Sequence, residues 1–85
     1  MGKRCGEMEL EQKRFLIGLN IAYYRRQCHM TQGDLSAHVG LSSNYLSQIE
    51  RGSKTISLEK LIQLADALGV EERELLDYTR GKNMA

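Results

Sequence analysis

The chain of 85 residues contains no proline, and no stretch of it alternates apolar and polar residues as a half-buried strand does. Both absences favour an all-α protein. Cysteine is scarce: Cys5 and Cys28 form no CxxC pair, and with His29 and His38 they match none of the usual zinc-binding spacings. We therefore expect no metal site. Cys28 is expected in the core, and two unpatterned cysteines fit a reducing compartment.

Long apolar runs and catalytic motifs are missing as well. No apolar stretch approaches the roughly 18 residues of a membrane span, and the start MGKRCG lacks a signal-peptide core, so we expect a cytoplasmic protein without a membrane partner. The sequence shows no nucleophile, histidine and acid in a recognisable context, no phosphate-binding glycine loop and no paired-carboxylate motif. These absences predict no enzyme, no cofactor and no small-molecule substrate.

The stretch TQGDLSAHVGLSSNYLSQIERG, residues 31–52, predicts two short helices joined by a tight turn. Thr31 and Asp34 have capping-box spacing, so the first helix begins directly after Thr31. Gly40 follows where a left-handed residue ends a helix without a Cβ penalty. Ser42 can then cap a second helix, which Gly52 is placed to stop.

The second of these helices, residues 42–51, divides into two faces. With Leu46 and Ile49 buried, the period of 3.6 residues leaves a polar set on the open side: Ser43, Asn44, Ser47 and Gln48. Asparagine and glutamine amides pair bidentately with adenine, and serine bonds to base edges or phosphate, so this face suits a major groove. On an isolated helix the same residues would indicate an ordinary solvated face. The neighbouring helix and tight turn favour the groove.

From about Ile17 to Asp77 the sequence resembles the Cro and phage-repressor (XRE-like) family of helix-turn-helix proteins. The resemblance rests on Arg25, MTQ at 30–32, Leu35, Gly40, SSNYLSQIERG at 42–52, ISL at 56–58 and ALGV at 67–70. Three positions depart from the family pattern: Ser36 where alanine is usual, Ala22 where a basic residue is frequent, and Ile56 where proline is common. The resemblance implies a five-helix, lambda-repressor-like domain that binds double-stranded DNA and represses transcription.

The resemblance also implies roles for particular residues. The helix 42–51 would enter the major groove, while the helix before it lies across the DNA backbone. The expected base contacts are Ser43, Asn44 and Gln48. The expected phosphate contacts are Gln32, Ser42, Tyr45, Ser47, Arg51 and Lys54. Arg25 would form a buried or half-buried ion pair with Glu50, because an unpaired charge on an apolar stripe is costly.

The net charge of +1 and the sequence pI of about 7.8 are low for a DNA-binding domain, whose pI usually exceeds about 9. The charges are unevenly distributed, however. Residues 1–55 hold eight basic and five acidic side chains, a balance of +3, whereas residues 56–85 hold four and six, a balance of −2. The basic part of the chain therefore contains the predicted DNA-binding unit.

We expect a single domain over residues 1–85, helical from 7 to 78, with a mobile tail at 1–6 and a frayed end at 79–85. A long first helix would bury one stripe: Leu10, Arg14, Ile17, Ile21, Arg25 and Cys28. Ser57 would cap a helix that ends at Gly69 and buries Leu58, Leu61, Ile62, Ala65 and Leu68. A fifth short helix is expected within residues 70–78.

One short recognition helix contacts only about three to five base pairs, which is too little to select one site in a genome. A homodimer on a palindromic operator is therefore expected. The predicted dimer surface is Leu75, Leu76 and Tyr78, with one leucine facing the partner and the other in the core. A monomer with both leucines inside is the alternative.

A second functional alternative is a protein-interaction module, or an antitoxin-like regulator, that uses the same fold to bind a protein partner. Apolar anchors on the open face of helix 42–51 would favour it. That face offers only Tyr45.

Overall fold

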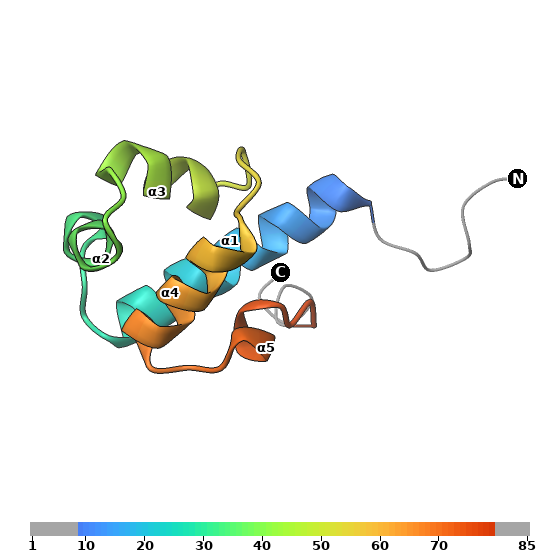
Figure 1. Cartoon of the computed structure of the whole chain (residues 1–85). Coiled ribbons are helices and arrows are strands. Elements are labelled where there is room, and N and C mark those ends of the chain that lie inside the picture. The colour runs from blue at the N-terminus through green and yellow to red at the C-terminus, as the bar shows by residue number, and fades with distance from the viewer. Residues whose placement is uncertain (1–8, 80–85) are drawn as a thin grey trace, which may run out of the picture.

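The computed structural model describes residues 9–79, which form five helices without a strand in that range (Figure 1). The helices are α1 (Leu10–Gln27), α2 (Gln32–Val39), α3 (Ser43–Glu50), α4 (Leu58–Leu68) and α5 (Glu72–Leu75). The prediction of an all-α chain is confirmed for this part. The fifth helix is a single turn, much shorter than the expected segment. The predicted tail at 1–6 lies outside the described residues, as do residues 80–85 of the other tail.

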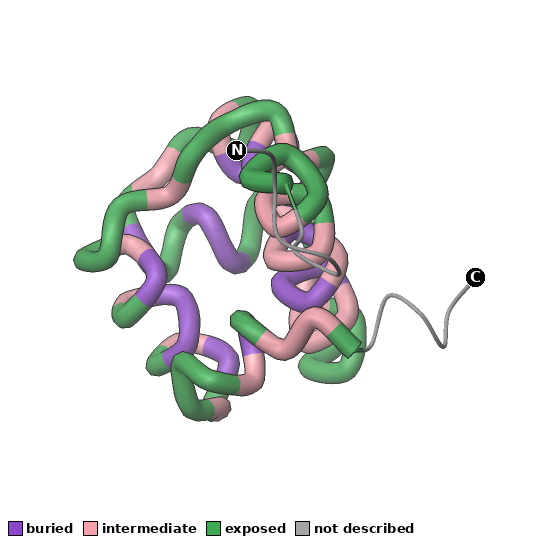
Figure 2. Tube along the Cα trace, turned by 90° about the vertical axis from the view of Figure 1, so that its right-hand side faces the viewer, coloured by how far each residue is buried: buried purple, intermediate pink, exposed green. Residues whose placement is uncertain are grey.

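Each helix contributes to one apolar core. Buried apolar side chains come from all five helices: Ile21, Leu35, Val39, Leu46, Ile49, Leu61, Leu64, Ala65, Leu68 and Leu75. In Figure 2 the buried stretches recur along the chain between exposed outer turns. Burying a leucine or isoleucine contributes about 1.5 to 3 kcal/mol, so this cluster is the main source of stability.

The predicted core stripe of α4 was partly wrong. Leu58 and Ile62 are 71% and 45% exposed, whereas Leu64, which the prediction omitted, is completely buried. The apolar residues of α4 fill two adjacent stripes, and only the stripe with Leu61, Leu64, Ala65 and Leu68 meets the other helices. Leu58 and Ile62, four residues apart, therefore form an exposed apolar face.

The ends of α1 also depart from the prediction. Leu10 and Cys28 were expected on the buried stripe, but both are exposed. Leu10 is the first residue of α1 and extends beyond the core. Cys28 follows the last turn as the C-cap, where its Sγ lies 3.6 Å from the carbonyl oxygen of Leu68.

Gly18 and Asn20 of α1, neither of which was predicted to have a role, bring other segments close to this helix. A Cβ added to Gly18 would lie 2.5 Å from the carbonyl oxygen of Ile49 and 2.6 Å from that of Glu50. Only glycine therefore allows the end of α3 to approach α1 this closely. Asn20 is buried and its Nδ2 donates to the carbonyls of Leu75 and Asp77, at 2.9 and 2.8 Å, which fixes the segment after α4 on α1.

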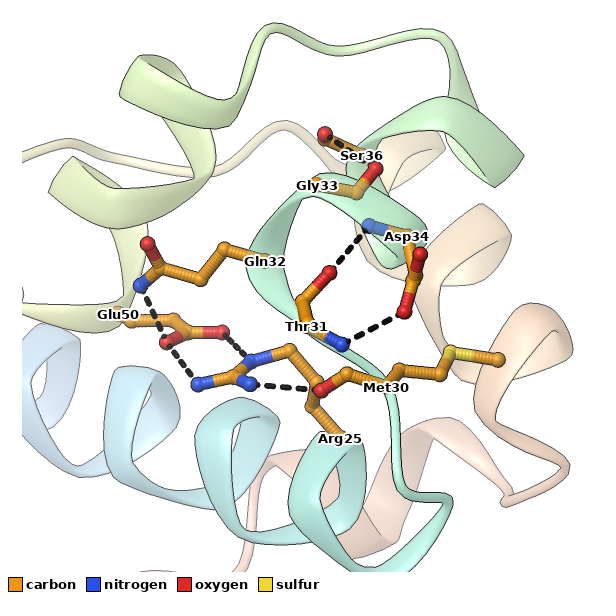
Figure 3. Close-up of polar contacts among 8 residues, drawn as sticks. All are labelled: Arg25, Met30, Thr31, Gln32, Gly33, Asp34, Ser36 and Glu50. Carbon is orange, nitrogen blue, oxygen red and sulfur yellow. Dashed lines mark hydrogen bonds and ion pairs between the residues drawn. The ribbon is translucent and has the colours of Figure 1, made fainter.

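The carboxylate of Glu50, the last residue of α3, joins three helices (Figure 3). Arg25 of α1 donates to it from Nε at 2.7 Å and from Nη2 at 3.1 Å, and its Nη1 donates to the carbonyl of Met30 at 2.8 Å. Gln32, the first residue of α2, donates from Nε2 to the same carboxylate at 2.9 Å. The side chains of Arg25 and Glu50 are only 12% and 6% exposed, so this is a largely buried pair.

Replacement of Glu50 by alanine should lower the free energy of unfolding by about 3 to 5 kcal/mol, because it leaves the Arg25 guanidinium desolvated without its partner. Urea unfolding followed by circular dichroism measures this change. Arg73→Ala is the matched control, since Arg73 and Glu71 form an ion pair that is 83% and 67% exposed. That control should cost less than about 1 kcal/mol. If both variants lost the same small amount of unfolding free energy, the pair of Arg25 and Glu50 would not have the stabilising role given to it here.

Candidate nucleic-acid interface

The entry into α2 is fixed by a reciprocal capping box. The Asp34 amide donates to Thr31 Oγ1 at 3.0 Å, and the Thr31 amide donates to Asp34 Oδ2 at 2.9 Å. The bond that the Asp34 carboxylate accepts from the Thr31 amide, and after it the interaction of the same carboxylate with the Thr31 side chain, hold the pKa of the Asp34 carboxyl below its ordinary value. The helix therefore begins where the capping-box spacing predicted.

The turn between α2 and α3 is equally well defined. Gly40 has a φ of 72°, in the left-handed region that glycine adopts without strain. The Leu41 amide then donates to the Ser36 carbonyl at 2.9 Å, and Ser42 Oγ accepts from the Tyr45 amide at 3.0 Å to start α3. Gly40 therefore ends α2 and Ser42 begins α3, as predicted from the sequence. Ser36 is buried at the crossing, and its hydroxyl donates to the Gly33 carbonyl at 3.0 Å.

The open face of α3 presents the three predicted base-contacting residues to solvent. Ser43 and Asn44 are exposed and Gln48 is half-buried, while Leu46 and Ile49 on the opposite side are buried. Asn44 and Gln48 are four residues apart and so lie on the same face. Within residues 9–79 neither side-chain amide has a hydrogen-bond partner in the structure, which leaves the donors and acceptors of both available to a ligand.

The residues expected at phosphates divide into two groups. Arg51 and Lys54 are exposed, directly after α3, and both carry a positive charge. The other four have internal contacts, and one of these contacts is made by Arg51 itself. Ser42 caps α3, Tyr45 packs half-buried against the core, Ser47 accepts a 2.9 Å bond from Arg51 Nη1, and Gln32 donates to Glu50. Of these contacts, the cap by Ser42 was predicted from sequence spacing. The contacts of Tyr45, Ser47 and Gln32 were not, because each depends on a tertiary contact or a rotamer that spacing does not specify.

The residues of the predicted dimer surface differ in their burial, and one of the two leucines lies in the core as expected. Leu75 is completely buried and therefore belongs to the core. Leu76 is 37% exposed, and Tyr78 is half-buried with Lys13 Nζ 5.6 Å from its ring centroid. The more exposed apolar residues, Leu58 and Ile62, lie on α4 instead.

Metal and membrane sites find no support in the described part of the chain. Between residues 9 and 79, no three His, Cys, Asp or Glu side chains gather as they would around a metal ion. In the same range, no helix has the length and apolar character to cross a bilayer.

Comparison with known proteins assigns the family. The helix-turn-helix model HTH_3 matches residues 21–75. The uncharacterised HTH-type transcriptional regulator y4dJ of Sinorhizobium fredii is 42% identical over 66 residues, which cover 78% of this chain and 86% of that protein. The control protein C.BamHI of Bacillus amyloliquefaciens is 36% identical over 67 residues, covering 78% and 83%.

A solved structure shares both the fold and part of the sequence. SinR, a master regulator for biofilm formation solved in complex with DNA, superposes with a TM-score of 0.68 at 32% identity, covering 72% of this chain and 98% of that one. The match of the family model spans four of the five helices completely and part of α1. The chain therefore belongs to the HTH_3, or XRE-like, family of helix-turn-helix transcriptional regulators with a lambda-repressor-like fold.

Proposed function

We propose that this DNA-binding transcriptional regulator is a repressor that recognises its operator through α3. The observation that supports this most is the pair of side-chain amides on the open face of α3, Asn44 and Gln48, which make no hydrogen bond within the described chain and lie next to exposed Ser43. In a major groove these side chains reach base edges, with the amides suited to adenine. A relative, SinR, has been solved on DNA. The place of action is then the cytoplasm, at the nucleoid.

The phosphate contacts come from both ends of the helix pair. Arg51 and Lys54 neutralise phosphates on one side of the groove. Gln32 Nε2 carries two hydrogens, so one can bond to Glu50 while the other donates to a phosphate at the start of α2. Ser42, Tyr45 and Ser47 make weaker contributions, because each already has an internal contact.

A protein-interaction module is the less favoured alternative. Such a surface needs apolar anchors on the open face of α3. Tyr45, which was the one candidate, packs half-buried against the core. The remaining open face of α3 is polar, which fits base edges better than an apolar groove.

Alanine at Asn44 or at Gln48 should weaken binding to the operator by about 1 to 3 kcal/mol each and leave binding to random DNA nearly unchanged, because base contacts are lost and phosphate contacts remain. Fluorescence anisotropy on both duplexes measures the ratio. Gln63→Ala on α4 is the control and should behave as the parent protein does. Equal losses on operator and random DNA would exclude base recognition by that residue.

Alanine at Arg51 or at Lys54 should lower affinity for every sequence. Each change should also reduce the slope of log K against log salt by roughly one, since a released counterion contributes about 0.9. Titrations at several salt concentrations give the slope, with Lys60→Ala on α4 as a matched loss of charge. A parent-like slope would remove the substituted residue from the interface.

A homodimer on a palindromic operator completes the proposal, because a second recognition helix supplies the discrimination that one lacks. Leu58 and Ile62 of α4, together with Leu76, provide the exposed apolar area for an isologous contact. Tyr78, which is half-buried under Lys13, is a further candidate for this contact. Such a contact would set the two α3 helices about 34 Å apart, one helical turn of DNA.

Sedimentation equilibrium should show a dimer for the parent protein. Ile62→Asp or Leu76→Asp should shift it toward the monomer, since a carboxylate would be buried in an apolar contact. Leu10→Asp, at a leucine of α1 that is 65% exposed and lies outside the proposed contact, is the control and should leave the dimer intact. A parent protein that is monomeric in solution and also binds as one copy per site would contradict dimerisation.

A further inference from the structure

We propose that Arg14 of α1 is a positioning residue for DNA binding, which acts by anchoring the loop that carries Lys54. This role rests on the proposed phosphate contact of Lys54. Arg14 lies outside α2, α3 and the turn between them, and the helix-turn-helix family model begins seven residues after it. The sequence analysis placed it only on the apolar stripe of α1.

The anchor is a hydrogen bond between residues far apart in the sequence. Arg14 Nη1 donates to Thr55 Oγ1 at 2.9 Å, and Thr55 directly follows Lys54. The Nε of Arg14 is buried and has no hydrogen-bond partner among the described residues. The inner nitrogen is therefore enclosed, while Nη1 reaches the loop.

The loop lies directly on α1 at a second point. Gly52 has a φ of 78°, and a Cβ added there would lie 2.8 Å from the Cα of Phe15, the residue next to Arg14. In Figure 1 the segment between α3 and α4 accordingly passes beside α1. The first half of α1 therefore supports the chain where it leaves the recognition helix.

Between these points the loop has few other attachments. Residues 53–55 are exposed, the Ser53 amide donates to the Gln48 carbonyl, and Ile56 packs against the core. For residues 54–56 of the described chain, the bond from Arg14 is the one hydrogen bond that the structure records. A lysine on an untethered loop loses conformational freedom when it binds phosphate, so the anchor lowers that cost before DNA arrives.

Three substitutions, each made alone and together with Lys54→Ala, separate the effect of anchoring from that of charge. Thr55→Val removes the bond without changing the charge. Arg14→Gln removes the bond and one positive charge, and Lys13→Gln removes the same charge from the adjacent position. Each is combined with Lys54→Ala, and dissociation constants on a random-sequence duplex are measured over a range of salt concentrations, well below each melting temperature.

Thr55→Val should weaken binding about two- to five-fold, the amount expected for one partly exposed hydrogen bond, and should reduce the salt slope toward that of Lys54→Ala. Arg14→Gln should weaken binding and reduce the salt slope by more than Lys13→Gln does. Neither Thr55→Val nor Arg14→Gln should weaken binding further when Lys54 is already alanine, because residues that act through one contact are not additive.

Three results would overturn the anchor. Parent-like binding by Thr55→Val, while Lys54→Ala lowers the slope, would contradict anchoring and leave the proposed function intact. Full additivity of Arg14→Gln with Lys54→Ala would show that Arg14 contacts phosphate itself. A parent-like slope for Lys54→Ala would remove Lys54 from the interface, and the role of Arg14 with it.

Discussion

The arrangement of the recognition helix depends on one buried carboxylate. Glu50 ends α3, and its charge would be strongly destabilising in a nearly closed site without compensating donors. Arg25 supplies two of those donors from α1, and Gln32 supplies a third from the start of α2. The same contact therefore satisfies a buried charge and fixes α3 relative to the two helices beside it. The glycine at position 18 allows the approach, since its missing Cβ leaves room for the last carbonyls of α3.

With α3 held in this position, helix geometry separates its apolar side chains from its polar ones. Leu46 and Ile49 face the core, so Asn44 and Gln48 lie on the other side of the helix, where their side-chain amides make no hydrogen bond with the described chain. Positive charge then follows within four residues of the end of the helix, at Arg51 and Lys54, rather than on the face that we propose reads bases. This separation explains how a chain of net charge +1 can bind DNA, because a few well-placed cations matter more than the total.

Local signals were predictable from the sequence. The caps at Thr31, Ser42 and Ser57 and the left-handed glycines at 40 and 69 lie where spacing placed them, because each involves residues within one turn of a helix. The partnership of Arg25 with Glu50 came from the resemblance to the family, since no local pattern links residues 25 positions apart.

Contacts that depend on how helices meet were not predictable in the same way. Leu58 and Ile62 fit an apolar stripe as well as Leu64 does, and only the position of the other helices decides which stripe is buried. The buried amide of Asn20 and the bond between Gln32 and Glu50 are likewise tertiary contacts. Of the candidate interface, the exposed faces and the Ser42 cap were predictable, whereas the bonds of Gln32 with Glu50 and of Ser47 with Arg51 were not.

The central claim is that α3, held by the Glu50 junction, recognises specific bases in duplex DNA. Selection of bound sequences from a pool of random duplexes tests it most directly, because the pool carries no assumption about the site. The account predicts enrichment of one motif with two-fold symmetry, whose half-sites are separated by about one helical turn, 10 to 10.5 base pairs. Binding that enriches no motif after repeated rounds would contradict it.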